Sequence, residues 1–255
     1  FTDVPSFLKK NSKTIDNFTL NTEKQEYLKN IEILKNEIGN GNSYQINYTV
    51  NGKFDFSGDI DTLFMQLMYN QSSRYNFFIN TGNNYIVSFS PELFFNIDGK
   101  SIITKPMKGT INRGRNIIED LLKKDIILSS TKEQSENVMI VDLLRNDLGQ
   151  ISQAGSVKVK KLFDLEKYET VFQMTSTIKS ILKSQDIGTI LSNIFPSGSI
   201  TGAPKIKTME LIEQIEKEKR GIYTGAIGII EKDKANFNVA IRTLKISRRT
   251  KKGEV

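Results

Sequence analysis

A tight Asp98-Gly99 turn between two apolar segments constrains the fold of this chain more than any other feature. The flanking residues 85–97 and 101–105 are rich in β-branched and aromatic side chains, which predicts two antiparallel strands joined as a hairpin. If Asp98 and Gly99 form the turn, position 92 faces position 105. Glu92 would then share one end of the hairpin with the segment 105–108.

A second hairpin is predicted near the end of the sequence, from residues 221–230 and 235–246. A turn centred between positions 232 and 233 would pair Tyr223 with Arg242 directly across the strands, with both side chains on one face. A bulge in either strand would break this register. A phenol and a guanidinium on one face can clamp a carboxylate, but they can equally stack as an exposed cation–π pair.

The other elements are predicted from apolar periodicity and capping residues, which together indicate a mixed α and β chain. The middle of one predicted helix is apolar on all sides, so we expect it to be buried and its Asp142 and Arg145 to pair. The predicted helices are 22–39, 60–69, 130–149 and 205–219, and the remaining predicted strands are 44–50, 156–162 and 170–180.

The composition excludes several kinds of chemistry. The 255 residues include no cysteine and no histidine, which excludes thiol nucleophiles, Ser-His-Asp catalysis and imidazole or thiolate metal ligands. Any metal must be held by oxygen ligands, which favours a hard cation such as Mg²⁺. The net charge of +7 is spread thinly and is not interleaved with aromatic residues, so we expect no nucleic-acid partner; a basic nucleic-acid-binding protein is the remote alternative. No apolar run is long enough to span a membrane.

Several residues could carry chemistry, each with a plainer explanation beside it. The glycine-rich stretch 198–204 precedes a helix and could bind an anion, or it could be a well-capped loop without a ligand. Glu133 and Glu136 lie one helical turn apart and could hold Mg²⁺, although acids in a first turn commonly serve the helix dipole alone. Glu92, flanked by apolar residues, could be a general acid with a raised pKa or the partner of Lys105.

Lys108 is the remaining candidate. It lies between Met107 and Gly109, where an apolar strand is ending. An amine on a short, defined loop can serve as a nucleophile or as an anion clamp, but most lysines lie in solvent.

These motifs match those of one protein family in their order and in their residues. The chain resembles the chorismate-utilising enzymes, which include the large subunits of anthranilate synthase and aminodeoxychorismate synthase and the isochorismate and salicylate synthases. The resemblance covers about residues 41–244, in the stretches SYQINYT, SPELFF, PMKGTINRG, KEQSENVMIVDLLRNDLG, MTSTI, FPSGSITGAPK, RGIYTGAIG and FNVAIRTL.

The resemblance implies an α+β fold like that of the anthranilate synthase large subunit, with two large antiparallel β-sheets packed face to face and flanking helices. We expect residues 1–255 to form a single chorismate-binding catalytic domain. The family usually continues beyond the last hairpin into a further motif with a second Mg²⁺ carboxylate, which we expect to be missing here.

Two positions indicate the branch of the family. Members that use water carry a lysine base where this chain has Gln45, and an amide cannot act as a base near neutral pH. Anthranilate-forming members typically carry alanine at position 108, whereas aminodeoxychorismate synthases carry lysine. The resemblance therefore implies amination of chorismate to 4-amino-4-deoxychorismate in para-aminobenzoate and folate biosynthesis, with ammonia from a glutamine amidotransferase partner, in the cytoplasm. Formation of anthranilate or isochorismate is the alternative.

The same resemblance implies roles for individual residues. Lys108 forms a covalent adduct with the substrate ring, Glu92 protonates the departing hydroxyl, and Gln45 completes the catalytic set. Mg²⁺ is expected at Glu136 with support from Glu133. Gln173 stands where the family often has a histidine, so it can donate a hydrogen bond but cannot titrate. The expected substrate-binding residues are Gly109, Thr110, Gln173, Ser199, Thr201, Gly202, Tyr223 and Arg242.

Overall fold

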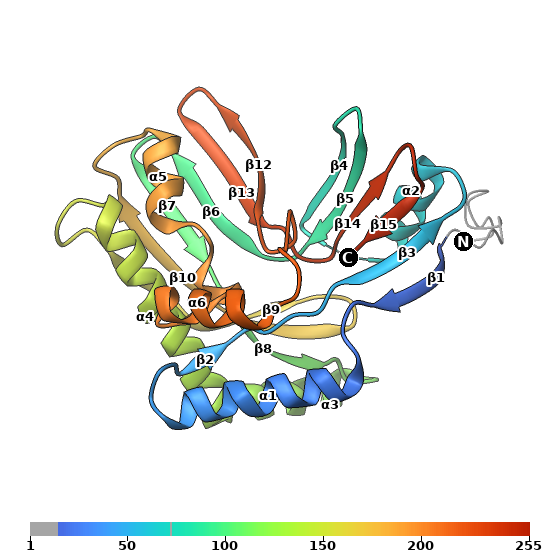
Figure 1. Cartoon of the computed structure of the whole chain (residues 1–255). Coiled ribbons are helices and arrows are strands. Elements are labelled where there is room, and N and C mark those ends of the chain that lie inside the picture. Colours follow the sequence, from blue (N-terminus) through green and yellow to red (C-terminus); the bar gives the residue numbers. More distant parts are fainter. Residues whose placement is uncertain (1–14, 72) are drawn as a thin grey trace.

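The computed structural model describes residues 15–71 and 73–255, so residues 1–14 and 72 of the predicted domain lie outside the described part. Two large antiparallel sheets diverge from a common junction, with helices on their outer sides (Figure 1). The predicted α+β fold with two large antiparallel sheets and flanking helices is confirmed. The smaller sheet has the strand order β1 (Ile15–Leu20), β3 (Gly52–Phe56), β15 (Lys252–Glu254), β14 (Thr243–Ser247), β5 (Asn84–Ser90) and β4 (Tyr75–Asn80).

The larger sheet has seven strands, and a third, two-stranded sheet pairs β2 (Gln45–Ile46) with β11 (Gly202–Ala203). The larger sheet has the order β12 (Ala226–Glu231), β13 (Lys234–Val239), β6 (Leu93–Asp98), β7 (Ser101–Lys105), β10 (Val171–Ile181) and β8 (Met107–Asn112), with β9 (Lys158–Lys167) also paired to β10. The helices are α1 (Lys24–Gly39), α2 (Ile60–Asn70), α3 (Ile117–Ser129), α4 (Thr131–Ile151), α5 (Ile187–Ile194) and α6 (Lys205–Ile215), with a short 3₁₀ turn η2 (Gly198–Ile200).

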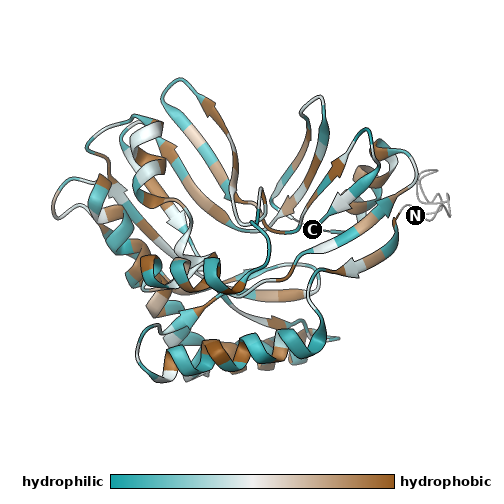
Figure 2. Ribbon diagram, in the orientation of Figure 1, coloured by the Kyte–Doolittle hydropathy of each residue, from teal (hydrophilic) through white to brown (hydrophobic). Residues whose placement is uncertain are grey.

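Each large sheet buries an apolar face against helices. The core of the larger sheet includes Phe95, Ile102 and Ile178, together with Ile140 of α4 and Ile190 of α5. The core of the smaller sheet joins its own apolar side chains to α2, with members Phe54, Phe56, Leu63, Val87 and Ile246. Apolar and polar residues alternate along several strands, as the hydropathy colours show (Figure 2). Because successive side chains of a strand point to opposite faces, this alternation favours one apolar face.

The chain crosses from one sheet to the other at two adjacent places, and this corrects the first predicted hairpin. Residues 85–97 are not one strand, because β5 belongs to the smaller sheet and β6 to the larger. Pro91, which has no N–H for a ladder bond, and Glu92 form the connection. The second crossing runs from β13 to β14 through residues 240–242, so the predicted strand 235–246 is also divided between the two sheets. Two connections between the sheets therefore meet at one junction.

The register of the first hairpin also differs from the prediction. Asp98 pairs with Ser101, so Gly99 and Lys100 form the turn, and Gly99 has φ +56°. An irregularity along the strands then pairs Leu93, and not Glu92, with Lys105. Glu92 still lies at the same end of the hairpin as the start of β8, as predicted.

The second hairpin has the predicted register from Glu231↔Lys234 to Ala226↔Val239. The ladder ends there. Thr224 and Arg242 adopt φ values of +61° and +51°, so the backbone turns away on both sides of the hairpin's end. The predicted cross-strand pair of Tyr223 and Arg242 therefore does not form, because the prediction extended the ladder past its last pair.

The remaining elements agree only in part with the sequence. Helices α1 and α2 and strand β10 are confirmed within two residues at each end, and β9 is confirmed but runs five residues beyond its predicted end. Helices α3 and α5 and strands β1, β3, β4, β8, β11 and β15 were not predicted. The predicted strand 44–50 shrinks to β2, because only β11 is available to pair with it and Tyr44 is 71% exposed. The predicted helix 205–219 ends at Ile215, with Pro204 as its N-cap.

Helix α4 begins at Thr131, one residue after the predicted start, with Ser130 as its N-cap, but it is not buried all round. Ile140 and Leu144 face the core, whereas Val138 is 46% exposed. Asp142 and Arg145 do pair, at 3.0 Å, but on the solvent side of the helix. Among residues 15–71 and 73–255, no helix combines the length and the apolar character that a membrane crossing needs.

Candidate active site

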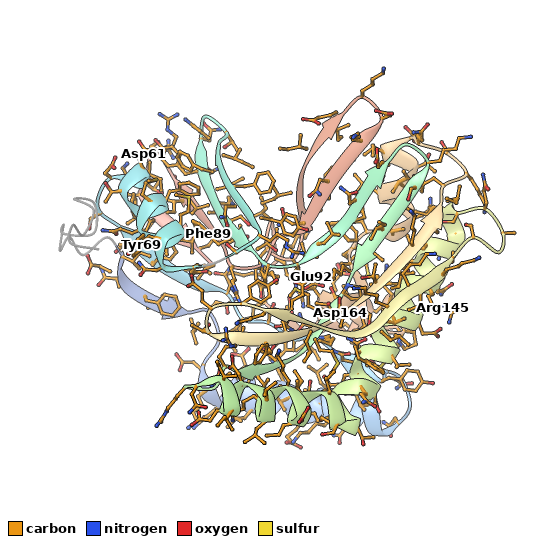
Figure 3. The ribbon with its side chains drawn as sticks, turned by 180° about the vertical axis from the view of Figure 1, so that it is seen from behind. Asp61, Tyr69, Phe89, Glu92, Arg145 and Asp164 are labelled. Atoms are coloured by element: carbon orange, nitrogen blue, oxygen red, sulfur yellow. The ribbon has the colours of Figure 1, made fainter. Side chains whose placement is uncertain are left out.

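Glu92 lies at the junction where the two large sheets come together (Figure 3). Its backbone is held on both sides: its N–H donates to Ser90 Oγ at 3.2 Å, and its carbonyl accepts from the N–H of Val239 at 3.1 Å. The residue is 6% exposed. The two crossings between sheets thus place one carboxyl group at a fixed, nearly dry position.

The surroundings of the Glu92 carboxyl favour its protonated form near neutral pH. Burial raises its pKa to about 7, although the Ser199 hydroxyl, the charge of Lys108 and the Met107 N–H each lower it. Three segments that are distant in sequence therefore meet at this carboxyl: the β5–β6 connection, the start of β8 and the glycine-rich loop. A carboxylic acid with this pKa can supply a proton at physiological pH.

The two lysines near this point have different partners. Lys105 forms an ion pair with Glu166 of β9, to which Tyr168 Oη also donates at 2.8 Å and Arg74 Nη1 lies at 3.3 Å. The alternative that Lys105 pairs with Glu92 is therefore wrong. Lys108, half-buried on β8, is the lysine whose charge acts on Glu92.

Gln173 binds the segment that follows Lys108. Its Nε2 donates to the Gly109 carbonyl at 2.9 Å, and its Oε1 accepts from Thr110 Oγ1 at 2.7 Å. Both polar ends of the amide are thus engaged across strands β8 and β10. Gln173, Thr110 and Arg242 line a hollow of about 380 Å³, together with Asn70, Gln71, Pro91, Met107, Tyr168, Glu169, Thr170 and Val171.

Gly109 has no room for a side chain. Its φ is +88°, and an added Cβ would lie 2.9 Å from Glu133 Oε2 and 3.3 Å from the Cβ of Met174. We expect Gly109→Ala to lower the free energy of unfolding by about 1–2 kcal/mol through its backbone conformation. It should also displace Lys108 and Glu133 and so lower turnover about tenfold or more.

Gly155→Ala provides the matched control for this prediction. Gly155 has a similar φ of +74°, but an added Cβ there meets nothing within 4 Å. Urea denaturation should give a similar backbone cost for the two variants, with turnover lowered in Gly109→Ala alone. Equal turnover in the two would contradict the tight fit at Gly109.

The glycine-rich loop is buried and lies against β2. Ser199 and Thr201 are 5% and 4% exposed, and Thr201 Oγ1 donates to the Ser197 carbonyl at 3.1 Å. Gly202, with φ +149°, pairs with Ile46 so closely that a Cβ would overlap the Gln45 carbonyl. The side-chain Oε1 of Gln45 is buried and has no hydrogen-bond partner in the described structure, which leaves one free acceptor beside the loop.

Tyr223 and Arg242 line two different hollows. Tyr223 lies with Glu216, Arg220 and Thr49 in a separate small hollow, whereas Arg242 lines the hollow that contains Gln173. Burial raises the pKa of Tyr223, and the Arg220 charge opposes this. The cross-strand pair from which the carboxylate clamp was predicted is therefore absent, and a role of either side chain in binding substrate stays a prediction.

Glu133 and Glu136 lie on successive turns of α4 with Glu133 directly above Gly109. Glu136 is partly exposed and lies 4.0 Å from Lys132. Within the described residues, no group of three or more Asp, Glu, His or Cys side chains gathers as a metal site. Mg²⁺ commonly takes only one or two protein carboxylates and completes its shell with ligand oxygens and water, so this pair fits such an ion.

Sequence reasoning missed an ion pair beneath the loop, between Asp147 of α4 and Lys205 of α6. A signal was present. Asp147 falls on the same helix face as Ile140, Leu144 and Ile151, where a carboxylate needs a partner. No comparable sequence pattern predicts that Ser199 lies beside Glu92, because the two residues are far apart in the sequence.

Comparisons with known proteins agree with this architecture. Residues 4–253 match the family described as chorismate binding enzyme. The probable chloroplastic aminodeoxychorismate synthase of Oryza sativa subsp. japonica is 38% identical over 94% of this chain and 27% of its own length. Aminodeoxychorismate synthase component 1 of Bacillus subtilis (strain 168) is 34% identical over 95% of this chain and 53% of its own length.

The fold is also that of a solved relative. The crystal structure of anthranilate synthase component I from Streptococcus pneumoniae TIGR4 superposes with a TM-score of 0.86 at 29% identity, covering 95% of this chain and 54% of that one. Curated anthranilate synthase components match over much of the chain as well. The chain spans about half, or less, of the relatives it matches, and overall similarity does not choose between their activities.

Proposed function

The chain belongs to the chorismate-binding enzyme family, and we propose that within it the protein aminates chorismate to 4-amino-4-deoxychorismate with ammonia. The observation that carries this proposal is the juxtaposition of the Lys108 amine and the buried Glu92 acid at the junction of the two sheets. One group can attack the substrate ring while the other protonates the leaving group.

The proposed chemistry balances with these two groups. The free amine of Lys108 bonds to ring carbon C2, both ring double bonds shift along the conjugated path from C2 through C1, C6 and C5 to C4, and the C4–O bond breaks as Glu92 gives its proton to the departing hydroxyl, which leaves as water. In the second step ammonia bonds to C4, both double bonds shift back, and the C2–N bond breaks to release Lys108. The new C4 ammonium returns a proton to the Glu92 carboxylate. Splitting one displacement into two steps lowers each barrier.

Three sets of polar residues support substrate orientation in this proposal. Arg242 and Thr110 line the hollow that also contains Pro91 and Met107, the chain neighbours of Glu92 and Lys108, and they can receive a carboxylate. The unpartnered Oε1 of Gln45 can accept a hydrogen bond but cannot remove a proton from water, which favours ammonia as the nucleophile. Ser199, Thr201 and Gly202 with their backbone are the proposed site for a second carboxylate.

The test is product analysis by mass spectrometry. The protein is incubated with chorismate, Mg²⁺ and an ammonium salt, alongside a reaction without ammonium. We expect 4-amino-4-deoxychorismate only when ammonium is present. Anthranilate or isochorismate in its place would establish the alternative activity, and the absence of any chorismate turnover would overturn the proposal.

A metal prediction accompanies this proposal. Glu136, with Glu133 beside it, would hold a Mg²⁺ ion, which supplies positive charge for the carboxylates of the substrate. We expect Glu136→Gln to raise the Mg²⁺ concentration for half-maximal turnover about tenfold or more, since an amide is a weaker ligand than a carboxylate. Magnesium titration of turnover measures this, with Glu210→Gln on exposed α6 as control. An unchanged midpoint would contradict Glu136 as a ligand.

A partner is part of the proposal. Relatives named as component 1 imply a second component, and a glutamine amidotransferase subunit is the source of ammonia that we propose. Co-purification followed by glutamine-dependent turnover would test it. A cytoplasmic location stays a prediction for cell fractionation to examine.

A further inference from the structure

Asp147 and Lys205 form a buried ion pair directly behind the glycine-rich loop of residues 195–204. Lys205 Nζ lies 2.6 Å from Asp147 Oδ2, and the two side chains are only 14% and 7% exposed. Burial raises the pKa of Asp147, and the Lys205 charge opposes this. A desolvated ion pair of this kind is costly to break, so it holds the start of α6 against α4.

Lys205 joins the two ends of the loop. It is the first residue of α6, immediately after the loop, and its Nζ also donates to the carbonyl of Ile194 at 3.0 Å. Ile194 is the last residue of α5, immediately before the loop. One ammonium group therefore closes the loop at its base, and Asp147 anchors that base to α4.

The middle of the loop connects α4 to the site. Gly198 lies so close to Leu143 of α4 that a Cβ would overlap that side chain. The hydroxyl of the next residue, Ser199, lowers the pKa of the buried Glu92 carboxyl, and its Oγ lies 2.9 Å from that of Ser197. The place of the Ser199 hydroxyl thus depends on how the loop is held at its base.

We propose that the Asp147–Lys205 pair is a positioning device that holds the Ser199 hydroxyl against the Glu92 carboxyl. The chemical consequence rests on the proposed function, in which Glu92 is the acid. Glu92 also faces Lys108 and the Met107 N–H from β8, while Lys105 of β7 is engaged by Glu166. Loss of the Ser199 bond, with Lys108 unchanged, stabilises the protonated form of Glu92 and raises its pKa further.

The experiment follows Glu92 directly by ¹³C NMR of protein labelled at the glutamate carboxyls, with Glu92→Gln to assign the signal. The informative variant is Asp147→Asn/Lys205→Met, which removes both charges and so leaves the net charge unchanged. We expect it to raise the Glu92 pKa by about one unit, as Ser199→Ala should. Combining the paired variant with Ser199→Ala should add nothing, because both changes remove the same bond.

Arg113→Met/Asp120→Asn is the matched control. That pair is comparably shielded, at 20% and 14% exposed, but links the residue that follows β8 to α3. It should leave the titration of Glu92 unchanged. If the Asp147–Lys205 variant lowers the melting temperature but leaves the pKa of Glu92 unchanged, the pair only stabilises the fold and the proposal is overturned. A pKa shift that adds to the shift caused by Ser199→Ala would also overturn it.

A second variant, and a titration that is independent of turnover, allow the proposal to be tested in every case. If the paired variant does not fold, Asp147→Glu retains the charge but lengthens the link, and it should still raise the Glu92 pKa. The NMR titration uses no chorismate, so it is independent of turnover. If the Glu92 pKa shifts in the paired variant but the protein does not aminate chorismate, the positioning role is retained and the proposed function is rejected. If the protein aminates chorismate but the Glu92 pKa does not shift, the proposed function is retained and the positioning role is rejected.

Discussion

Replacing Lys108 with alanine is expected to lower kcat/KM for 4-amino-4-deoxychorismate formation by about 10³-fold or more, because the proposed covalent route loses its nucleophile. Incubating the wild-type protein with chorismate but without ammonium should accumulate an adduct that intact-protein mass spectrometry detects, with the mass of chorismate less water. The variant should show no such adduct. Peptide mapping should place the wild-type adduct on residue 108.

Lys105→Ala is the comparison that isolates position 108. Lys105 is only three residues away, but it pairs with Glu166 and does not face Glu92. We expect this variant to retain the adduct. Undiminished 4-amino-4-deoxychorismate formation in Lys108→Ala would reject the lysine as nucleophile while leaving the activity in place. Products must be identified in every case, because the resemblance to chorismate-utilising enzymes implies alanine at this position in anthranilate-forming members.

How far the sequence predicts the fold depends on how local each feature is. The register of the second hairpin followed from its turn, because each pair in a ladder fixes the next. The pairing of Tyr223 with Arg242 failed because it extended that rule beyond the last ladder pair. The break at Pro91 failed differently: both strands around it are apolar, and hydropathy does not say that they belong to different sheets.

The candidate site shows the same division. Glu92 and Lys108 were predicted to be close, and they are, because a slip in register by one residue moves a neighbouring position only a few ångströms. The approach of Ser199 to Glu92 could not be predicted, since it requires α4, α5 and α6 to be in place first. Non-local contacts of this kind are fixed by packing and leave no periodic pattern in the chain.

Glu92→Gln is expected to lower kcat by about 10²–10⁴-fold, since the amide cannot protonate the leaving hydroxyl. In the wild-type protein the acid works only while it holds its proton. Because burial raises the pKa of Glu92 to about 7, its contribution to turnover should fall as the pH rises through that value. The limb of the pH–rate profile near pH 7 should vanish in the variant, and a profile of unchanged shape would reject Glu92 as the acid.

The same substitution should change stability in a direction fixed by that pKa. The folded protein binds the Glu92 proton more tightly than the unfolded chain, whose carboxyl has a pKa of 4.5. The stabilisation from this proton is complete below about pH 4.5 and is lost as the pH rises through about 7, an order-of-magnitude change of about 3 kcal/mol. Glutamine carries no such ionisation, so Glu92→Gln should gain stability relative to the wild type between pH 5 and pH 8 by most of that amount.

Urea denaturation at the two pH values measures this difference. Glu210→Gln is a suitable control, because its carboxyl lies on the exposed side of α6, 3.5 Å from Lys207. It should give nearly the same stability change at both values. An equal change for Glu92→Gln at pH 5 and pH 8 would mean that Glu92 ionises as a solvated carboxyl does. The junction of the two sheets would then hold no proton for the leaving hydroxyl at neutral pH, and the proposed acid step would have to use another group.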